Sequence, residues 1–345
     1  MTSNVPASPS PASVSPEPLI QMMQGFLVTA ILRAGIQLGI FDQIAGGNDG
    51  AGSIAAAVGA DKRGTRILLD ALTALGLLER DDSYRLTPLA EAFLVTDRSG
   101  YLGGMINILA GSWTWTAYDR LPEAVVRGGA ILDQHAETPS HEFWEVFAPS
   151  SIGMAAPTAQ ELAELLQEWA GQREKLEILD IACGSGLYGL TLAAQHPMAH
   201  ATLLDWANVL ERTKDNVDRL GLRERTSFID GDVFAVALGR PYDVIIASQI
   251  FHHFSEQRCL ELMRRLADAL KPDGRLVIHE VVSGKRPADD PLSYLFSVMM
   301  LAWSHAGEAY SFDTYRKLLR EAGFSPPEVH ESHGMPSGFL LAELG

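Results

Sequence analysis

The stretch that decides the fold is Ile178-Leu179-Asp180-Ile181-Ala182-Cys183-Gly184-Ser185-Gly186. Its apolar, β-branched first half predicts a buried strand, and a helix is expected to open at about Leu187. Glycines at 184 and 186 let the backbone turn sharply and approach a ligand closely. The free N–H groups at the start of the following helix would face that ligand. A Gly-x-Gly turn after a strand also fits a tight turn without a ligand, so other positions must decide between the two.

Outward from this stretch, short β-branched runs alternate with helical stretches from about Lys175 onward. Such alternation predicts a parallel sheet covered by helices on both faces, that is, an α/β protein with a doubly wound, Rossmann-like sheet. The expected strands are 177–181, 201–205, 226–229, 244–247 and 276–281.

Acidic residues follow the second and third of these strands. Asp205 lies 25 positions after Asp180, where a carboxylate can accept hydrogen bonds from both hydroxyls of a ribose. Asp232 follows the third strand, where it can accept from an adenine amino group while Val233 and Phe234 cover the ring. Because open α/β sheets bind ligands at the carboxyl ends of their strands, these acids predict a nucleoside site.

The first part of the chain has a different texture. Residues 1–17 are rich in Pro and Ser and are expected to form a disordered tail. The pattern of residues 18–110 predicts several helices, one of them capped by Asp61, and then a hairpin formed by 78–80 and 84–87. Helices followed by a hairpin are typical of a winged-helix domain. The helix after Asp61 is apolar on too many sides to lie in a DNA groove, so a dimerisation role is favoured.

Composition excludes several partners. The 345 residues carry a formal net charge of −16, whereas phosphate binding needs a concentrated basic surface, so no nucleic-acid partner is expected. Two cysteines make no disulfide framework and favour a reducing cytoplasm. No charged segment typical of a secretory signal precedes Arg33, and the longest apolar runs fall short of the roughly 18 residues that span a bilayer, so no membrane partner is expected.

Two segments together carry a resemblance. Asp-Ile-Ala-Cys-Gly-Ser-Gly at 180–186 resembles the first motif of class I S-adenosylmethionine methyltransferases, although Gly189 also completes a dinucleotide-type glycine spacing. Leu-Lys-Pro-Asp-Gly-Arg-Leu-Val-Ile at 270–278 resembles a late motif of the same methyltransferases. From about Pro18 to the end, the layout is similar to the small-molecule O-methyltransferase family, in which an N-terminal winged-helix domain serves dimerisation.

The resemblance implies S-adenosylmethionine as methyl donor and S-adenosylhomocysteine as product. Asp205 would hold the ribose, Trp206 would flank the nucleoside, and Asp232 would hold the adenine. The family often has a lysine where Ser248 stands. The complete set of implied donor-binding residues is Asp180, Gly184, Gly186, Asp205, Trp206, Asp232, Val233, Phe234 and Ser248.

The segment 248–256 resembles the family's catalytic stretch and places His252 at the position of the general base. An imidazole suits this task because its pKa lies near the operating pH. Glu280 matches an acidic residue that orients the base, while Ala309 stands where the family often has a second acid. The alternative interpretation is that His252 packs at a strand end and Glu280 is a satisfied polar group.

A second alternative concerns metal. His252, His253 and His305 could converge on a divalent ion, as in a smaller branch that C-methylates α-keto acids with help from a metal. In the favoured interpretation no metal is expected, and the reaction is O-methylation of a hydroxyl. A non-catalytic or DNA-binding relative is the third possibility, although His252 is present and a basic exposed helix is not.

Residues 111–170 are expected to form a helical connection that contributes to the acceptor pocket, and residues 171–345 the donor-binding domain. Expected partners are a small-molecule acceptor and a second copy of the chain in a homodimer. The residues expected to line the acceptor pocket are Trp115, Met154, Met299 and Trp303, of which the last two are as compatible with core positions.

Overall fold

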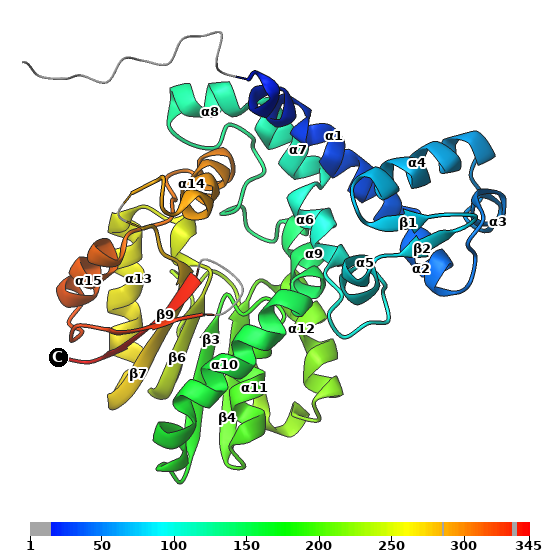
Figure 1. The fold of residues 1–345 in the computed structure, drawn as a ribbon. Helices are drawn as coiled ribbons and strands as arrows, with labels where there is room; N and C mark the ends of the chain where they lie inside the picture. The colour runs from blue at the N-terminus through cyan, green and yellow to red at the C-terminus, as the bar shows by residue number, and fades with distance from the viewer. Residues whose placement is uncertain (1–14, 285, 333–336) are drawn as a thin grey trace, which may run out of the picture. The chain divides into compact units, whose positions relative to one another are not determined.

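A computed structural model describes residues 15–284, 286–332 and 337–345 of the chain (Figure 1). Contacts divide it into two compact units, residues 1–106 and 107–345. Most of the expected disordered tail lies outside the described residues, and its last residue, Glu17, is already the first residue of helix α1.

The first unit consists of short helices and one hairpin. Strands β1 (Leu78–Arg80) and β2 (Tyr84–Leu86) pair antiparallel, which confirms the predicted hairpin. Asp61 caps α4 by accepting a hydrogen bond from the Gly64 N–H at 2.9 Å, as expected. The helices are α1 (Glu17–Gln37), α2 (Ile40–Ala45), α3 (Ala51–Ala57), α4 (Lys62–Ala74) and α5 (Pro88–Phe93).

Helix α1 is long, apolar and largely uncovered within its unit. Among the described residues it is the one helix long and apolar enough to cross a membrane, judged by length and composition alone. Its uninterrupted apolar runs are short, as the sequence indicated, because Gln21 and Gln24 break them, yet 18 residues of the helix together have a mean hydropathy of 1.5. Only Gly35 is buried in α1, where a Cβ would lie 3.1 Å from the Leu72 side chain.

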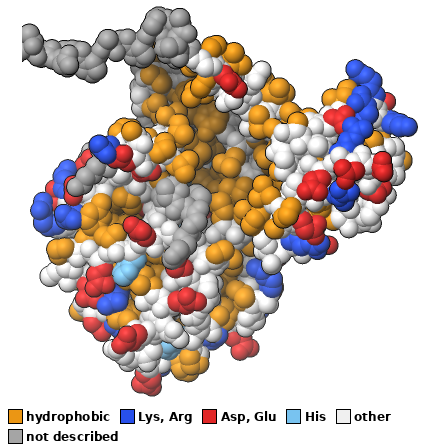
Figure 2. All heavy atoms as spheres, viewed as in Figure 1, with side chains coloured by type: hydrophobic (Ala, Val, Ile, Leu, Met, Phe, Trp, Pro, Cys, Tyr) orange, Lys and Arg blue, Asp and Glu red, His pale blue; other side chains and the backbone are white. Residues whose placement is uncertain are grey.

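Helix α4 exposes basic side chains, which gather over it in Figure 2. Arg66 forms an ion pair with Asp70 one turn later, at 2.8 Å, so part of this charge is neutralised locally. The expected absence of a nucleic-acid partner remains a prediction.

The second unit contains a seven-stranded sheet in the order β5-β4-β3-β6-β7-β9-β8. The five strands from β5 to β7 are parallel, which confirms the doubly wound arrangement. Two further strands were not anticipated: β9 runs antiparallel to β7, and β8 pairs antiparallel with β9 and so runs in the direction of the five parallel strands. The strands are β3 (Leu176–Ile181), β4 (Ala199–Asp205), β5 (Thr226–Asp230), β6 (Tyr242–Ser248), β7 (Leu270–Val281), β8 (Glu328–Glu331) and β9 (Ser337–Glu343).

Helices cover both faces of this sheet because alternate side chains of each strand point to opposite faces. Leu179 and Ile245 pack with α13 (Glu256–Ala269) and α15 (Phe312–Glu321) on one face. Ile178 and Val244 pack with α10 (Ile152–Gly171), α11 (Leu187–Gln195) and α12 (Ala207–Arg219) on the other, and Figure 1 shows these two layers.

Several helices precede or interrupt this pattern. They are α6 (Ile106–Leu109), α7 (Ser112–Asp119), α8 (Leu121–Arg127), α9 (Glu142–Ser150) and α14 (Pro291–Trp303). Of these, α7 and α8 contact α14, and α9 contacts α12. The chain runs from β3 outward to β5 and then returns to β6 on the other side of β3, so the strand order reverses at β3. Ligands of open α/β sheets bind at such a point, beyond the carboxyl ends of the strands.

Candidate active site

The turn after β3 has the sharp backbone that its glycines predicted. Ala182, Gly184 and Gly186 all have positive φ, at 47°, 53° and 73°. A Cβ at Gly186 would lie 2.7 Å from the Thr213 side chain, so glycine is required there both for conformation and for space. The turn leads directly into α11, and its backbone is open to a ligand on the carboxyl side of the sheet.

Asp205 holds this turn from the end of β4. Its Oδ2 accepts the Gly184 N–H at 2.8 Å and its Oδ1 accepts the Trp206 N–H at 2.7 Å. Burial raises the pKa of Asp205 to about 6, against the lowering effect of these two hydrogen bonds. Each carboxylate oxygen has a second acceptor site, so a fixed Asp205 can still receive two hydroxyl donors.

Asp180, at the end of β3, has a partner inside the chain. Its Oδ2 accepts the Gly189 N–H at 2.9 Å, and a Cβ at Gly189 would lie 3.0 Å from the Asp180 Cβ. Gly189 therefore allows α11 to pack closely on β3. The Oδ1 atom is buried without a hydrogen-bond partner among the described residues. Burial raises the pKa of Asp180 to about 8, and the charge of Asp205 adds to this.

Asp232 lies beside Asp205 because the Gly231 N–H donates to the Asp205 carbonyl at 3.0 Å. Its Oδ1 accepts the Phe234 N–H at 2.9 Å, which fixes the turn after β5. Val233 is buried, whereas the Phe234 ring lies 3.8 Å from the guanidinium carbon of Arg258.

Ser248, at the end of β6, is engaged by a buried histidine. Its Oγ lies 3.0 Å from Nδ1 of His279, which the Tyr188 hydroxyl also approaches at 3.1 Å. The other ring nitrogen lies 3.0 Å from Ser337 Oγ. Burial lowers the pKa of His279 to about 4, so this ring is a neutral part of the core. The sequence analysis gave Ser248 to the donor site, and the structure directs its hydroxyl to His279.

His252 and Glu280 meet after β6 and near the end of β7. Nδ1 of His252 lies 2.6 Å from Oε2 of Glu280, and Oε1 of Glu280 accepts the Phe251 N–H at 2.7 Å. Glu280 is 0% exposed and His252 is 4% exposed. A carboxylate fixed by two hydrogen bonds orients the imidazole and leaves its Nε2 as the nitrogen available for proton transfer.

Aromatic rings surround this pair. The Phe296 ring of α14 lies edge-on to His252 at 4.8 Å, and the His253 ring lies at 4.2 Å. Trp144 of α9 contacts His253 at 5.4 Å, and Phe143 contacts Trp303 at 4.9 Å. Burial and the adjacent His252 lower the pKa of His253 well below its usual range. Of the four residues that the sequence suggested for the acceptor pocket, Trp303 belongs to this group of aromatic rings.

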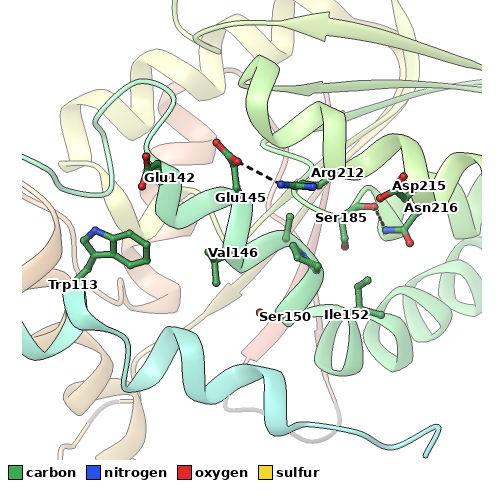
Figure 3. A pocket seen from close by; sticks show the side chains of 12 residues that line it. Trp113, Glu142, Glu145, Val146, Ser150, Ile152, Ser185, Arg212, Asp215 and Asn216 are labelled. Carbon is green, nitrogen blue, oxygen red and sulfur yellow. Dashed lines mark hydrogen bonds and ion pairs between the residues drawn. The ribbon is translucent and has the colours of Figure 1, made fainter. Parts of the chain in front are cut away.

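A separate pocket of about 600 Å³ lies between α9, the start of α10 and α12 (Figure 3). Glu145 and Arg212 point toward each other in Figure 3. The distance between Glu145 Oε2 and Arg212 Nη2 is 3.8 Å. From the turn after β3 the pocket lining includes Ser185, whose carbonyl accepts from Asn216 at 2.8 Å. Its lining includes Trp113 but none of Trp115, Met154, Met299 and Trp303.

The alternative metal set is not brought together. Within the described ranges, the group of ligand-type side chains that contains His305 is His135, Glu137 and His305. The His305 ring lies 4.1 Å from the His135 ring, whereas His252 is held by Glu280. His135 and Glu137 were not expected from the sequence because they lie on a loop without periodicity. Phe143 and Trp144 were not expected either, although three aromatic residues within 143–147, in a helical stretch, could have indicated them.

A sheet in this strand order, with a glycine turn after β3 and carboxylates after β4 and β5, defines the class I S-adenosylmethionine-dependent methyltransferase fold. A model of the O-methyltransferase domain matches residues 151–325, and a model of the O-methyltransferase dimerisation domain matches residues 20–96. The chain belongs to the O-methyltransferase family and uses S-adenosylmethionine as its methyl donor.

Relatives match over nearly the full length. The chain is 30% identical over 321 residues to the 3-hydroxy-5-methyl-1-naphthoate 3-O-methyltransferase of Streptomyces sahachiroi, covering 91% of each chain. It is 30% identical over 340 residues to the acetylserotonin O-methyltransferase of Rattus norvegicus, covering 95% of this chain and 77% of the relative. A solved structure assigned as an O-methyltransferase of Nostoc punctiforme has a TM-score of 0.90 and 30% identity, covering 96% of this chain and 99% of that one.

Proposed function

We propose that the chain methylates the hydroxyl of an aromatic small molecule, with His252 as general base and Glu280 as the residue that positions it. The observation that carries this proposal is the 2.6 Å contact between His252 Nδ1 and Glu280 Oε2 at the carboxyl edge of the sheet. In the proposal the pair shares the carboxyl edge of the sheet with the turns that hold the donor, and the acceptor hydroxyl is held between them.

The residues present fit S-adenosylmethionine. The turn 182–186 exposes backbone at positive φ, and Asp205 offers a carboxylate held by two N–H groups. In the proposal Gly184 and Gly186 adjoin the methionine part, Asp205 and Trp206 the ribose, and Asp232 with Val233 the adenine. When bound, the donor supplies a methyl group on a positively charged sulfur.

In the proposed reaction His252 accepts a proton while the methyl group is transferred. His252 Nε2 takes the proton of the acceptor hydroxyl as its oxygen bonds to the methyl carbon, and the electron pair of the broken carbon–sulfur bond stays on sulfur. Glu280 accepts the hydrogen bond of Nδ1–H, which fixes the tautomer and stabilises the imidazolium. Positioning of the two reactants supplies most of the remaining acceleration.

An aromatic acceptor is favoured by the rings around His252. Phe296, His253 and Trp144 form a succession of edge-on contacts, which suits a flat ring better than an aliphatic chain. The naphthoate methyltransferase, one of the relatives named above, acts on an aromatic hydroxyl according to its name.

We further propose a homodimer formed through the winged-helix-like first unit, and a cytoplasmic location. The dimerisation-domain model includes most of α1, whose exposed apolar side chains need a cover. They are Leu19, Ile20, Met22, Met23, Phe26, Leu27 and Val28. A second copy of the chain provides this cover without a membrane. Both cysteines are buried free thiols, consistent with a reducing compartment.

The test is an activity screen in the presence of EDTA. The full chain is incubated with methyl-labelled S-adenosylmethionine and a panel of phenols, naphthols, aliphatic alcohols and α-keto acids. The expected result is transfer of label to a phenolic oxygen, with one S-adenosylhomocysteine formed per methyl. Label on carbon of a keto acid, or activity that appears only after a divalent metal is added, would contradict the proposal.

A further inference from the structure

Two segments distant in sequence are joined beside the catalytic pair. The loop after α8 donates two backbone hydrogen bonds to the end of α14. They run from Ala130 N–H to the Ser304 carbonyl and from Ala136 N–H to the Trp303 carbonyl, both at 2.8 Å. The His305 N–H donates to Oε1 of Glu137 at 3.0 Å. The junction therefore has a defined geometry, built from residues 130–137 and 303–305.

Three side chains of ligand type converge at this junction. The rings of His135 and His305 lie 4.1 Å apart, and Glu137 lies beside them. One candidate ligand atom from each lies within 4.8 Å of the others. Glu137 uses only Oε1 for the His305 N–H, so its second oxygen has no hydrogen bond assigned to it. No other such cluster of three occurs among the described residues.

We propose that His135, Glu137 and His305 form a binding site for a divalent transition metal of the zinc type. Two imidazoles and one carboxylate are a donor set that zinc accepts, with water as fourth ligand, whereas magnesium and calcium prefer oxygen alone. Ligand atoms of tetrahedral zinc lie roughly 3.4 Å apart, so the side chains must close by about 1 Å. The His305 side chain is exposed. An ion bound to Nδ1 of His135 would replace the weak 3.3 Å hydrogen bond that this atom accepts from the Glu137 N–H.

The ion would fasten the two segments rather than take part in methyl transfer. Gly307 packs so tightly on His252 that a Cβ there would collide with the His252 carbonyl oxygen. On the other segment, Ala136 accepts a hydrogen bond at 3.1 Å from the Trp144 indole, whose ring contacts His253. Both segments that the ion would join therefore contact residues of the proposed acceptor site, His252 on one side and Trp144 on the other. If the proposed function holds, metal should lower the KM for the acceptor severalfold and leave kcat nearly unchanged.

The experiment measures metal binding directly, so that it does not depend on the acceptor. Chain without a histidine tag is freed of metal with EDTA, dialysed and titrated with Zn²⁺ alone by calorimetry at pH 7.5. We expect one equivalent to bind at micromolar affinity and to raise the melting temperature. Two variants should each weaken binding at least tenfold, His305→Ala and Glu137→Gln. The first removes an exposed side chain, and the second keeps the acceptor for the His305 N–H.

His330→Ala is the matched control, because His330 lies 3.7 Å from Glu328 without completing such a cluster. It should bind Zn²⁺ like the unaltered chain. The metal site is overturned if the unaltered chain does not bind Zn²⁺. It is also overturned if His305→Ala and Glu137→Gln bind Zn²⁺ with the affinity of the unaltered chain. Methyl transfer in EDTA is scored separately: its presence without Zn²⁺ binding leaves the proposed function intact, and Zn²⁺ binding without methyl transfer does the reverse.

Discussion

The Glu280 carboxylate connects a side chain and a backbone group of the same short turn: Oε2 contacts His252 Nδ1 at 2.6 Å and Oε1 accepts the Phe251 N–H at 2.7 Å. Both groups lie at the end of β6, while Glu280 belongs to the neighbouring strand β7. The orientation of His252 is therefore set by the pairing of β6 with β7.

His252→Ala should reduce kcat by roughly 10²- to 10⁴-fold, because the acceptor loses its proton acceptor in the transition state. Affinity for S-adenosylhomocysteine, measured by calorimetry, should change little, since no donor contact is assigned to His252. His200→Ala, at a site hydrogen-bonded to Ser227 on the sheet, is the control and should retain activity. A His252→Ala enzyme with near-normal kcat would remove the imidazole from the mechanism.

Glu280→Gln should lower kcat by about 10²-fold or more while preserving the fold, because an amide can donate to Nδ1 and stabilise the unproductive tautomer. Nitrogen NMR of labelled histidine distinguishes this from simple damage: Nδ1 of His252 should carry the proton in the unaltered chain and lose it in the variant. An unchanged tautomer accompanied by a large fall in melting temperature would instead indicate a structural role.

Asp205→Ala should weaken donor binding by about 2–3 kcal/mol, because two hydroxyls lose a charged acceptor. The variant also frees the Gly184 and Trp206 N–H groups, so Asp205→Asn, which keeps one acceptor, should lose less. With the pKa of Asp205 raised to about 6, affinity for S-adenosylhomocysteine should fall as the pH drops below about 6. Calorimetry at pH 7.5 and pH 5 checks both statements, and equal affinities throughout would place the ribose elsewhere.

Asp180 predicts a pH dependence of stability. Its pKa is about 8 in the folded chain and near 3.8 when unfolded, so the native state holds a proton that the unfolded state releases. The contribution of this group to the free energy of unfolding therefore falls as the pH rises from about 4 to about 8. Urea unfolding at pH 6.5 and 8.5 should show this decline in the unaltered chain and a smaller one in Asp180→Asn. If the free energy of unfolding changed equally in both chains between pH 6.5 and 8.5, the pKa of Asp180 would not be raised in the folded state.

Met22→Asp combined with Phe26→Asp should convert a dimer into monomers, because both side chains are more than 60% exposed on α1 and a carboxylate cannot be buried cheaply at an apolar interface. Gln24→Asp on the same helix adds charge without removing apolar surface and should remain more dimeric. Light scattering at micromolar concentration gives the molar mass. A dimer that survives the double change would place the interface elsewhere.

The sequence was most informative where geometry follows from topology. Asp205 and Asp232 could be placed together because parallel strands end at one edge. His252 and Glu280 were paired through the family resemblance, and the 2.6 Å contact between them agrees with that pairing. The acceptor wall could not be predicted in this way. Trp115, Met154 and Met299 sit on helices whose rotation about their own axes is fixed by packing, which one apolar pattern does not determine. His305 was singled out from the sequence together with His252 and His253, whereas the residues that it contacts, at 135–137, lie on a loop that has no pattern to reveal them.

The enclosure of His252, with 4% of its surface exposed, has a consequence for the catalytic cycle. In the proposed reaction every turnover leaves one proton on an imidazole that water hardly reaches. That proton must pass to solvent before the next acceptor can react. The cycle therefore contains a separate step in which the His252 imidazole is deprotonated. The Phe296 ring and the Gly307 backbone both pack on His252, so this proton has to pass them in every cycle.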